Sequence, residues 1–223
     1  MGLDCKPMQP HLWQLDSDGF LGRIRSVLPH LDLQAEGVRM GPFGREQSRR
    51  MQHLFPAEPR RAAVLLPLVQ RPEGLSLLFT LRAEGMTNHA GQVSFPGGRM
   101  EPGDPDAAAA ALRETHEEVG IAPGSVEILG LMPDHMVISG YRVTPVVGLV
   151  DPTVKTCPQP GEVAACFEAP LAYLLDPANR VLRRLQVEGV DFDAFDLPWH
   201  RHLIWGATAG MVLCLGELLE RQS

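Results

Sequence analysis

The most informative segment of the chain is GGRMEPGDPDAAAAALRETHEEVGI, residues 97–121. Its second half predicts a helix on which Glu114, Glu117 and Glu118 share an arc of about 100°. Like charges at these spacings repel one another, and the helix dipole disfavours anions in the last turn, before Gly120. A divalent cation between the carboxylates would remove both penalties. Mg²⁺ and Mn²⁺ prefer such oxygen ligands, so the segment predicts a metal site.

The ends and the opposite face of this helix are also marked in the sequence. Asp104 suits the N-cap, Pro105 suits the first helical position, and Gly120 suits the C-terminal end. A second face, about 120° from the carboxylates, would let the helix pack closely on a sheet. This face carries Ala108, Ala111, Leu112, Thr115 and Val119. The alternative interpretation is a solvated surface helix with an accidental cluster of glutamates.

The segment resembles the Nudix box, whose pattern is G-x5-E-x7-R-E-U-x-E-E-x-G-U, with U an apolar residue. It matches at Gly98, Arg113, Glu114, Glu117, Glu118, Gly120 and Ile121. It departs at Asp104, which replaces a Glu and is separated from Arg113 by eight residues rather than seven. It also departs at Thr115, which takes an apolar position. One subgroup of the family, the coenzyme A diphosphatases, has the same Asp and the extra residue.

A second motif lies upstream of the box. The segments LFTLRA (78–83) and FPGG (95–98), with Gly91 between them, are similar to the coenzyme A motif LLTxR[SA]x3Rx3Gx3FPGG in every spacing. The clear departure is Thr87, where the motif has Arg. Four further segments resemble the same subgroup: 139–148, 162–163, 169–171 and 204–209. With them, the likeness extends over about residues 60–221.

The resemblance implies a fold and an activity. The expected fold is α/β (α+β), a Nudix-type α/β/α sandwich with a mixed β-sheet over residues 61–223, after an N-terminal extension over residues 1–60. The expected activity is metal-dependent hydrolysis of the diphosphate bond of coenzyme A or acyl-CoA, which yields 4′-phosphopantetheine (or its acyl form) and 3′,5′-ADP. Because of Thr87, another nucleoside diphosphate derivative such as ADP-ribose remains an alternative substrate. A non-catalytic Nudix-fold binding module is a third interpretation, although such modules usually lack a box carboxylate.

The resemblance also implies roles for individual residues. Glu114, Glu117 and Glu118 are expected to bind two or three Mg²⁺ or Mn²⁺ ions, with the carbonyl of Gly98 as a further ligand. Such ions neutralise phosphate charge and lower the pKa of a bound water. Arg113 is expected to orient the glutamates, and Asp104 to pair with Arg113 or only to cap the helix.

Residues outside the helix complete the predicted site. Glu162 is the candidate general base, with a solvated loop glutamate as the alternative. Arg82 is favoured over Arg99 as a phosphate contact, since arginine forms bidentate charge-assisted bonds. Gly91 and Phe95 are the remaining candidates for substrate binding, with core packing as the alternative for Phe95. His116 is expected to be structural. His89 and His135 are expected in loops beside segments of the predicted site, with ordinary polar loop residues as the alternative.

Composition restricts the class of partner. The net charge of −7 and the pI of about 5.6 argue against broad binding to nucleic acid or to an anionic membrane. A small nucleotide-type substrate is therefore the expected partner, and a homodimer is left open. The four cysteines show no C-x-x-C spacing and no signal peptide is recognised, so a cytoplasmic location is expected.

Apolar patterning predicts the remaining elements. The apolar stretch 203–216 is shorter than the ~20 residues that span a bilayer, so it is expected in a buried closing helix. Trp205 is expected in the core. The predicted helices cover 18–28, 171–175 and 203–221, and the predicted strands cover 63–69, 76–82, 92–95, 126–132, 143–150, 163–168 and 181–187.

Overall fold

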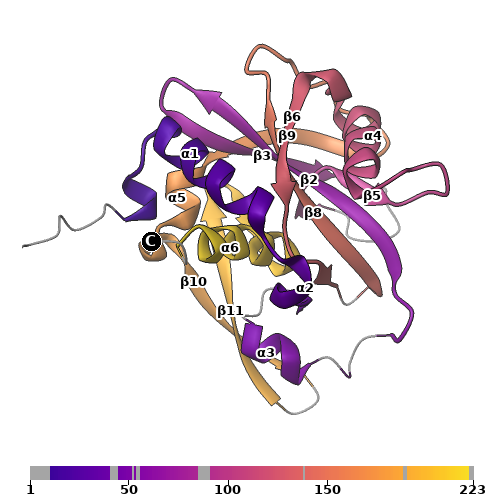
Figure 1. Ribbon diagram of the computed structural model, residues 1–223, viewed down its shortest axis with the longest axis vertical. Helices are drawn as coiled ribbons and strands as arrows, with labels where there is room; N and C mark the ends of the chain where they lie inside the picture. The colour runs from indigo at the N-terminus through magenta and orange to yellow at the C-terminus, as the bar shows by residue number, and fades with distance from the viewer. Residues whose placement is uncertain are drawn as a thin grey trace, which may run out of the picture.

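The computed structural model describes residues 11–40, 45–51, 53, 56–84, 91–137, 139–187 and 190–220 (Figure 1). Its main feature is a mixed sheet in which β2 (Arg60–Arg71) runs parallel to β8 (Tyr141–Val150) and antiparallel to β3 (Gly74–Arg82). Strand order follows β1-β7-β8-β2-β3-β4, with β5 on β2, β6 on β8 and β9 on β3. The other strands of this sheet are β1 (Arg39–Met40), β4 (Val93–Ser94), β5 (Gly97–Arg99), β6 (Val126–Leu131), β7 (His135–Met136) and β9 (Val163–Pro170).

Helices cover both faces of this sheet, with α4 (Ala107–Val119) on one side and α1 (Ser17–Val27), α5 (Leu171–Leu175) and α6 (Gly206–Glu220) on the other (Figure 1). The alternation of side chains along β2 produces the two layers. Ala63 and Leu65 pack with α4, whereas Leu66 and Leu68 join the core beneath α1 and α6. The structure confirms the predicted fold class, a mixed sheet between helices.

The N-terminal segment contributes to the main core. Helix α1 begins after Asp16, whose side chain accepts a hydrogen bond from the Gly19 N–H at 2.8 Å. Its apolar stripe, Phe20, Ile24 and Val27, is buried in the same cluster as Leu66 and Leu77. The division at residue 60 stays a prediction, but α1 buries its apolar face against the sheet. Two short helices, α2 (Leu33–Glu36) and α3 (Arg45–Arg50), were not predicted.

The C-terminal part differs from the prediction in one respect. Strand β10 (Val181–Val187) has its predicted bounds, but β11 (Val190–Trp199) and β12 (His202–Ile204) complete a three-stranded sheet that was missed. Leu203 therefore pairs with Pro198 instead of starting α6. Trp205 is 37% exposed rather than in the core, and the Arg183 guanidinium lies 5.4 Å from its ring centre.

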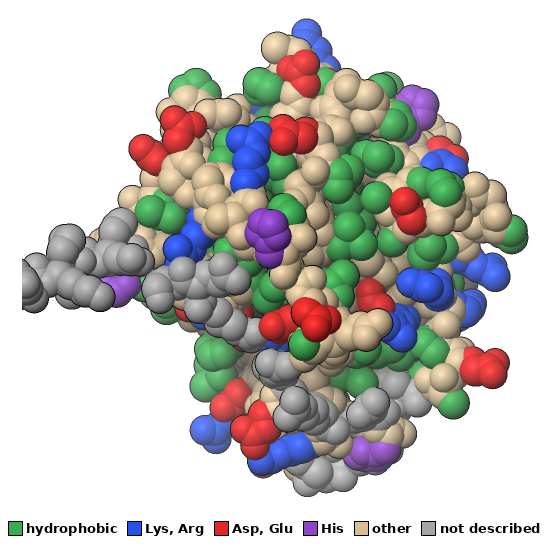
Figure 2. Space-filling model, viewed as in Figure 1, with side chains coloured by type: hydrophobic (Ala, Val, Ile, Leu, Met, Phe, Trp, Pro, Cys, Tyr) green, Lys and Arg blue, Asp and Glu red, His purple; other side chains and the backbone are tan. Residues whose placement is uncertain are grey.

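Two surface properties bear on the expected partners. None of the described helices is both long enough and apolar enough to cross a membrane. On the face shown in Figure 2, basic side chains lie among acidic ones, so the coloured part of that face has no continuous basic track.

Candidate active site

Helix α4 presents the predicted acidic face beside the glycine segment β5. Its N-cap is Asp106, whose side chain accepts a hydrogen bond from the Ala109 N–H at 2.8 Å, so the prediction of Asp104 as the cap was wrong. The helix ends as predicted at Gly120, which has a left-handed φ of 73°. On its inner side Ala110 and Ala111 are fully buried against Ala63 and Leu65. These small side chains place the helix axis close to the sheet.

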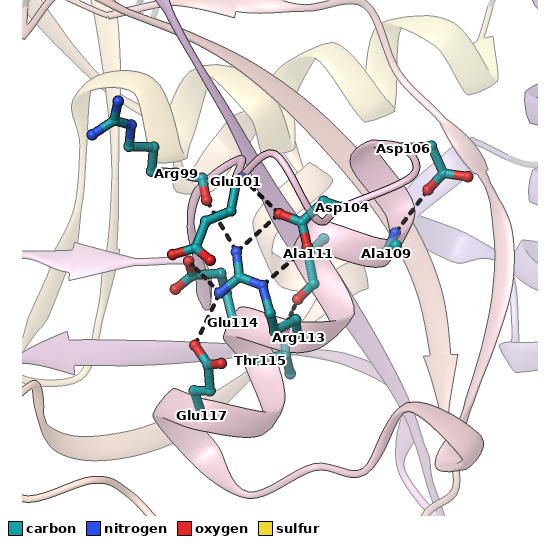
Figure 3. A network of polar contacts seen from close by, with 10 residues as sticks. All are labelled: Arg99, Glu101, Asp104, Asp106, Ala109, Ala111, Arg113, Glu114, Thr115 and Glu117. Carbon is teal, nitrogen blue, oxygen red and sulfur yellow. Dashed lines mark hydrogen bonds and ion pairs between the residues drawn. The ribbon is translucent and has the colours of Figure 1, made fainter.

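Arg113 is the centre of a polar network (Figure 3). Its guanidinium makes a forked pair with Asp104, in which Nε and Nη2 each donate to one carboxylate oxygen at 3.0 Å. Nη1 donates to Glu114 and to Glu117, both at 3.0 Å, and Nη2 also donates to the carbonyl of Arg99 at 3.1 Å. Asp104 therefore serves as the partner of Arg113, and the pKa of its carboxyl is lowered by that hydrogen bond first of all.

Gly97 and Gly98 allow the closest approaches in the site. A Cβ on Gly98 would lie 2.5 Å from the Glu114 carboxylate, and a Cβ on Gly97 would lie 2.4 Å from the carbonyl oxygen of Ala63. Gly97 also has a backbone φ of 150°, which residues other than glycine rarely adopt. Gly97 must therefore be glycine for β5 to pair with β2, and Gly98 leaves room for the Glu114 carboxylate.

The carboxylates of Glu118 and Glu114 are shielded from water, and their hydrogen bonds do not fully offset the lost hydration. Glu118 is 5% exposed, and its carboxylate accepts one hydrogen bond, at 3.0 Å, from the Gly97 N–H. Burial raises the pKa of Glu118 to about 7, and Glu114 and Glu162 add repulsion that the charge of Arg82 opposes. Burial likewise raises the pKa of Glu114, although its hydrogen bond from Arg113 opposes the shift. A cation bound between these groups would remove both unfavourable effects.

Arg82 and Glu162 approach the same carboxylates from β3 and the loop before β9. The charge of Arg82 acts on Glu118, and Glu162 acts on both Glu114 and Glu118. Their backbones are joined through Ala83, whose N–H donates to the Glu162 carbonyl at 2.9 Å. Nε of Arg82 is buried and has no hydrogen-bond partner among the described residues. Gly91, with a φ of 70°, donates its N–H to the Arg82 carbonyl at 3.1 Å and closes this loop.

Other predicted residues lie farther from the carboxylates. Phe95 is buried and stacks on Phe79 with ring centres 4.9 Å apart, which favours the core role that was its alternative. The side chain of Arg99 points away from the Arg113 network, to which it contributes its carbonyl (Figure 3). His135 is not in a loop but in β7, buried next to α6, so the expectation that it lies beside the site was wrong. His116 is exposed on α4, and both His89 and Thr87 lie outside the described residues.

The sequence did not indicate how the C-terminal end of α4 is held. The loop that precedes β9 folds against this end: the Cys157 N–H donates to the Val119 carbonyl, and the Gln159 N–H donates to the Glu118 carbonyl, both at 2.8 Å. These backbone contacts bring Glu162 to the site. No side-chain pattern encodes these backbone contacts, so the roles of Cys157 and Gln159 could not be found from the sequence.

The donor chemistry of the site suits a hard divalent cation. Three carboxylates on one helix and the backbone of Gly98 supply oxygen ligands, which Mg²⁺ and Mn²⁺ prefer. Among the described residues no three acidic, histidine or cysteine side chains are already grouped to hold an ion. Arg113 engages Glu114 and Glu117, and Glu118 is bonded to Gly97. Each of these bonds engages one oxygen of its carboxylate, so the second oxygen of each glutamate is left for an ion.

Comparison with known proteins places this site in a family. The sequence model of the NUDIX domain matches residues 59–185. A protein named uncharacterized Nudix hydrolase NudL from Enterobacter sp. (strain 638) is 46% identical over 154 residues, which cover 69% of this chain and 79% of the relative. The protein of that name from Escherichia coli (strain K12) is 43% identical over the same length and coverage.

A solved structure supports the fold independently. The crystal structure of a Nudix hydrolase from M. smegmatis, RenU, aligns with 74% of this chain and 88% of its own with a TM-score of 0.51, at 19% identity. At this identity the likeness concerns the fold alone. The matched domain, the relatives and the carboxylate helix agree with one another. The chain therefore belongs to the Nudix family, and it is a hydrolase that acts on phosphoric anhydrides.

Proposed function

We propose that this protein is a coenzyme A diphosphatase that uses Mg²⁺ or Mn²⁺ to split the diphosphate of coenzyme A or its thioesters into 4′-phosphopantetheine (or its acyl form) and 3′,5′-ADP. The family supports the coarser activity, metal-dependent hydrolysis of a nucleoside diphosphate derivative. The observation that carries the substrate proposal is the position of the coenzyme A motif. From the FPGG segment (95–98), the Gly97 N–H donates to the buried carboxylate of Glu118, and the charge of Arg82 acts on the same group. Gly91 donates its N–H to the Arg82 carbonyl.

Each residue of the site has a distinct role in this proposal. Bound Mg²⁺ or Mn²⁺, held by Glu114, Glu117, Glu118 and the Gly98 carbonyl, would neutralise phosphate charge and acidify a bound water. Arg113 holds Glu114 and Glu117 in position on α4 through its contacts with Asp104. These interactions keep the ligand set ordered before the substrate arrives.

The diphosphate itself is received by groups opposite the helix. The buried Nε of Arg82 has no partner among the described residues, so it can donate to a phosphate oxygen without losing another bond. Glu162, which is exposed and near Glu114 and Glu118, can accept the proton of an attacking water. Gly91 positions the loop that carries Arg82, and Arg99 is the less favoured cation.

A second substrate class remains in the proposal. Thr87 replaces the arginine of the coenzyme A motif, which favours another nucleoside diphosphate derivative such as ADP-ribose. A binding module without turnover is the third interpretation, and the presence of Glu114, Glu117 and Glu118 argues against it. A cytoplasmic location and a homodimer also stay predictions.

Product analysis by mass spectrometry tests the substrate. The purified chain would be incubated with Mg²⁺ or Mn²⁺ and with coenzyme A, acetyl-coenzyme A, ADP-ribose, NADH and diadenosine polyphosphates in matched amounts. Selective formation of 3′,5′-ADP and 4′-phosphopantetheine is the expected result. Preferential cleavage of ADP-ribose would instead favour the second substrate class, another nucleoside diphosphate derivative. No cleavage of any compound with either metal would contradict both proposed substrate classes and favour an untested substrate or the binding module.

A further inference from the structure

A cavity of about 420 Å³ lies on the α4 side of the sheet, next to the carboxylates but separate from them. Its floor is apolar, formed by the buried side chains of Val69, Leu78, Ile121 and Val150. Its rim is polar and comes from the end of β2, the loop before β9, and β9 itself. The rim residues are Arg71, Asp151, Lys155, Thr156, Cys166 and Glu168.

The cavity begins where the catalytic helix ends. Ile121 follows Glu118 by three residues, and the Gln159 N–H of the rim loop bonds the Glu118 carbonyl. Cys166 lies opposite Thr80 in the sheet, and two residues along β3 from Thr80 is Arg82. Burial raises the pKa of the Cys166 thiol, and the charge of Glu118 raises it further, so the thiol and the carboxylate are electrostatic neighbours. A substrate with its diphosphate at Glu118 could therefore extend into this cavity.

The charged side chains on the rim differ in whether they already have hydrogen-bond partners. Arg71 forms a forked pair with Glu168, with donor–acceptor distances of 3.0 and 2.6 Å, and donates to the Pro152 carbonyl at 2.8 Å. The Asp151 carboxylate accepts hydrogen bonds from the backbone and the hydroxyl of Thr153. Lys155 is exposed, and its side chain makes no hydrogen bond or ion pair with any described residue. The ammonium of Lys155 is thus the rim cation that is available to a ligand.

We infer that this cavity binds the nucleotide end of the substrate and that Lys155 recognises a phosphate monoester on its ribose, which makes Lys155 a specificity-determining residue. The inference rests on the proposed function, because the nucleotide end of coenzyme A carries such a monoester. An apolar floor accepts a base, and an unpaired ammonium at the rim supplies the charge that a dianionic phosphate requires. Ligand clefts commonly combine apolar walls with a few such polar groups.

Matched substrates test the inference by kinetics. Coenzyme A and dephospho-coenzyme A differ only in the ribose monoester, so Lys155 should act on one and not on the other. Lys155→Ala should lower kcat/KM for coenzyme A by about tenfold, mainly through KM, and leave dephospho-coenzyme A within about twofold. Lys155→Arg should restore most of the loss. Arg184→Ala removes an exposed cation from β10 and serves as the control. Equal losses for both substrates in Lys155→Ala, or no loss for either, would overturn the inference.

A binding experiment separates failure of the inference from failure of the proposed function. The affinities of 3′,5′-ADP and 5′-AMP for the wild-type protein and for Lys155→Ala can be measured by titration calorimetry in Mg²⁺, without any turnover. Tighter binding of 3′,5′-ADP than of 5′-AMP, with the difference lost in Lys155→Ala, is expected even if coenzyme A is not the substrate. Equal affinities in the wild-type protein would overturn the subsite. A wild-type protein that discriminates the two nucleotides but leaves coenzyme A intact would contradict the proposed function alone.

Discussion

Arg113 and Arg39 occupy two contrasting environments in the same chain. Arg113 lies at the partly exposed catalytic edge, and its guanidinium donates five hydrogen bonds of 3.0–3.1 Å. Arg39 is 2% exposed, yet its nearest ion-pair contacts, to Glu36 and Glu217, are 3.5 and 3.4 Å long. Nε and Nη2 of Arg39 have no hydrogen-bond partner among the described residues.

The comparison shows that burial and organisation are separate properties of a charged group. The hydrogen bonds of Arg113 fix the directions of Glu114 and Glu117, which is what a metal site needs before it binds an ion. Arg39 lines a cavity of about 300 Å³ with His135 and Arg180, and it is held there by burial and charge rather than by directed bonds. A loosely paired buried ion contributes little net stability, since loss of hydration offsets the attraction.

The largest expected effect tests the catalytic edge directly. Glu117→Gln and Glu118→Gln should each lower kcat by about a hundredfold or more, because an amide cannot replace a carboxylate as a ligand for a hard cation. Circular dichroism and Tm should stay near those of the wild-type protein. Glu127→Gln, at an exposed position of β6, is the control and should keep full activity. Wild-type turnover in either site variant would refute the assignment of metal ligands.

The two neighbouring glycines should separate activity from stability. In Gly98→Ala the new Cβ meets the side-chain carboxylate of Glu114 rather than backbone, so the carboxylate should be displaced and kcat should fall by about thirtyfold with little change in Tm. In Gly97→Ala the Cβ meets the backbone of β2 and the φ is unfavourable, so the free energy of unfolding should fall by about 2–3 kcal/mol. Urea unfolding and steady-state kinetics on both variants provide the measurement. Full activity in Gly98→Ala would show that Glu114 need not lie against Gly98.

A matched pair of substitutions compares the two arginines themselves. Arg113→Lys removes the planar fork that joins Asp104 to Glu114 and Glu117, so kcat should fall by about tenfold. Arg39→Lys keeps the charge where directed bonds at Nε and Nη2 are absent, so stability should change by less than about 1 kcal/mol and activity should be unchanged. A large loss of stability in Arg39→Lys would contradict the contrast between the regions.

The smallest expected effect is a pH dependence of stability at the buried region. Burial lowers the pKa of His135 from its usual 6.5 to about 4, and the positive charge of Arg39 also lowers it. As the pH falls, His135 therefore binds a proton at a higher pH in the unfolded chain than in the folded one. Between pH 6.5 and 5.5 this group should reduce the free energy of unfolding by about 1 kcal/mol. His135→Asn, whose amide can still donate to the Pro133 carbonyl, should lack this slope, as measured by urea unfolding at both values. Identical pH slopes in the two proteins would mean that His135 is not held neutral.

Local signals predicted most of the elements around the site. Short apolar runs predicted β2, β3, β8 and β9, and the box predicted a helix that ends at Gly120. The start of that helix was misplaced by two residues, because Asp104 and Asp106 are both good caps and the pairing of Asp104 with Arg113 depends on the folded loop. Strand β11 was missed because its alternating Asp and Phe residues are followed by Leu-Pro-Trp, which does not read as a strand.

What the sequence determined is the acidic face of α4, because the positions of Glu114, Glu117 and Glu118 on one face follow from helix geometry alone. It also indicated that Arg82, Gly98 and Glu162 belong with them. The tertiary structure decided which carboxylates are buried, which donor each one meets, and which loop closes the end of α4. These outcomes depend on contacts between residues far apart in the chain, such as Gly97 with Glu118 and Arg82 with the loop before β9, and burial sets the electrostatics only once those contacts form.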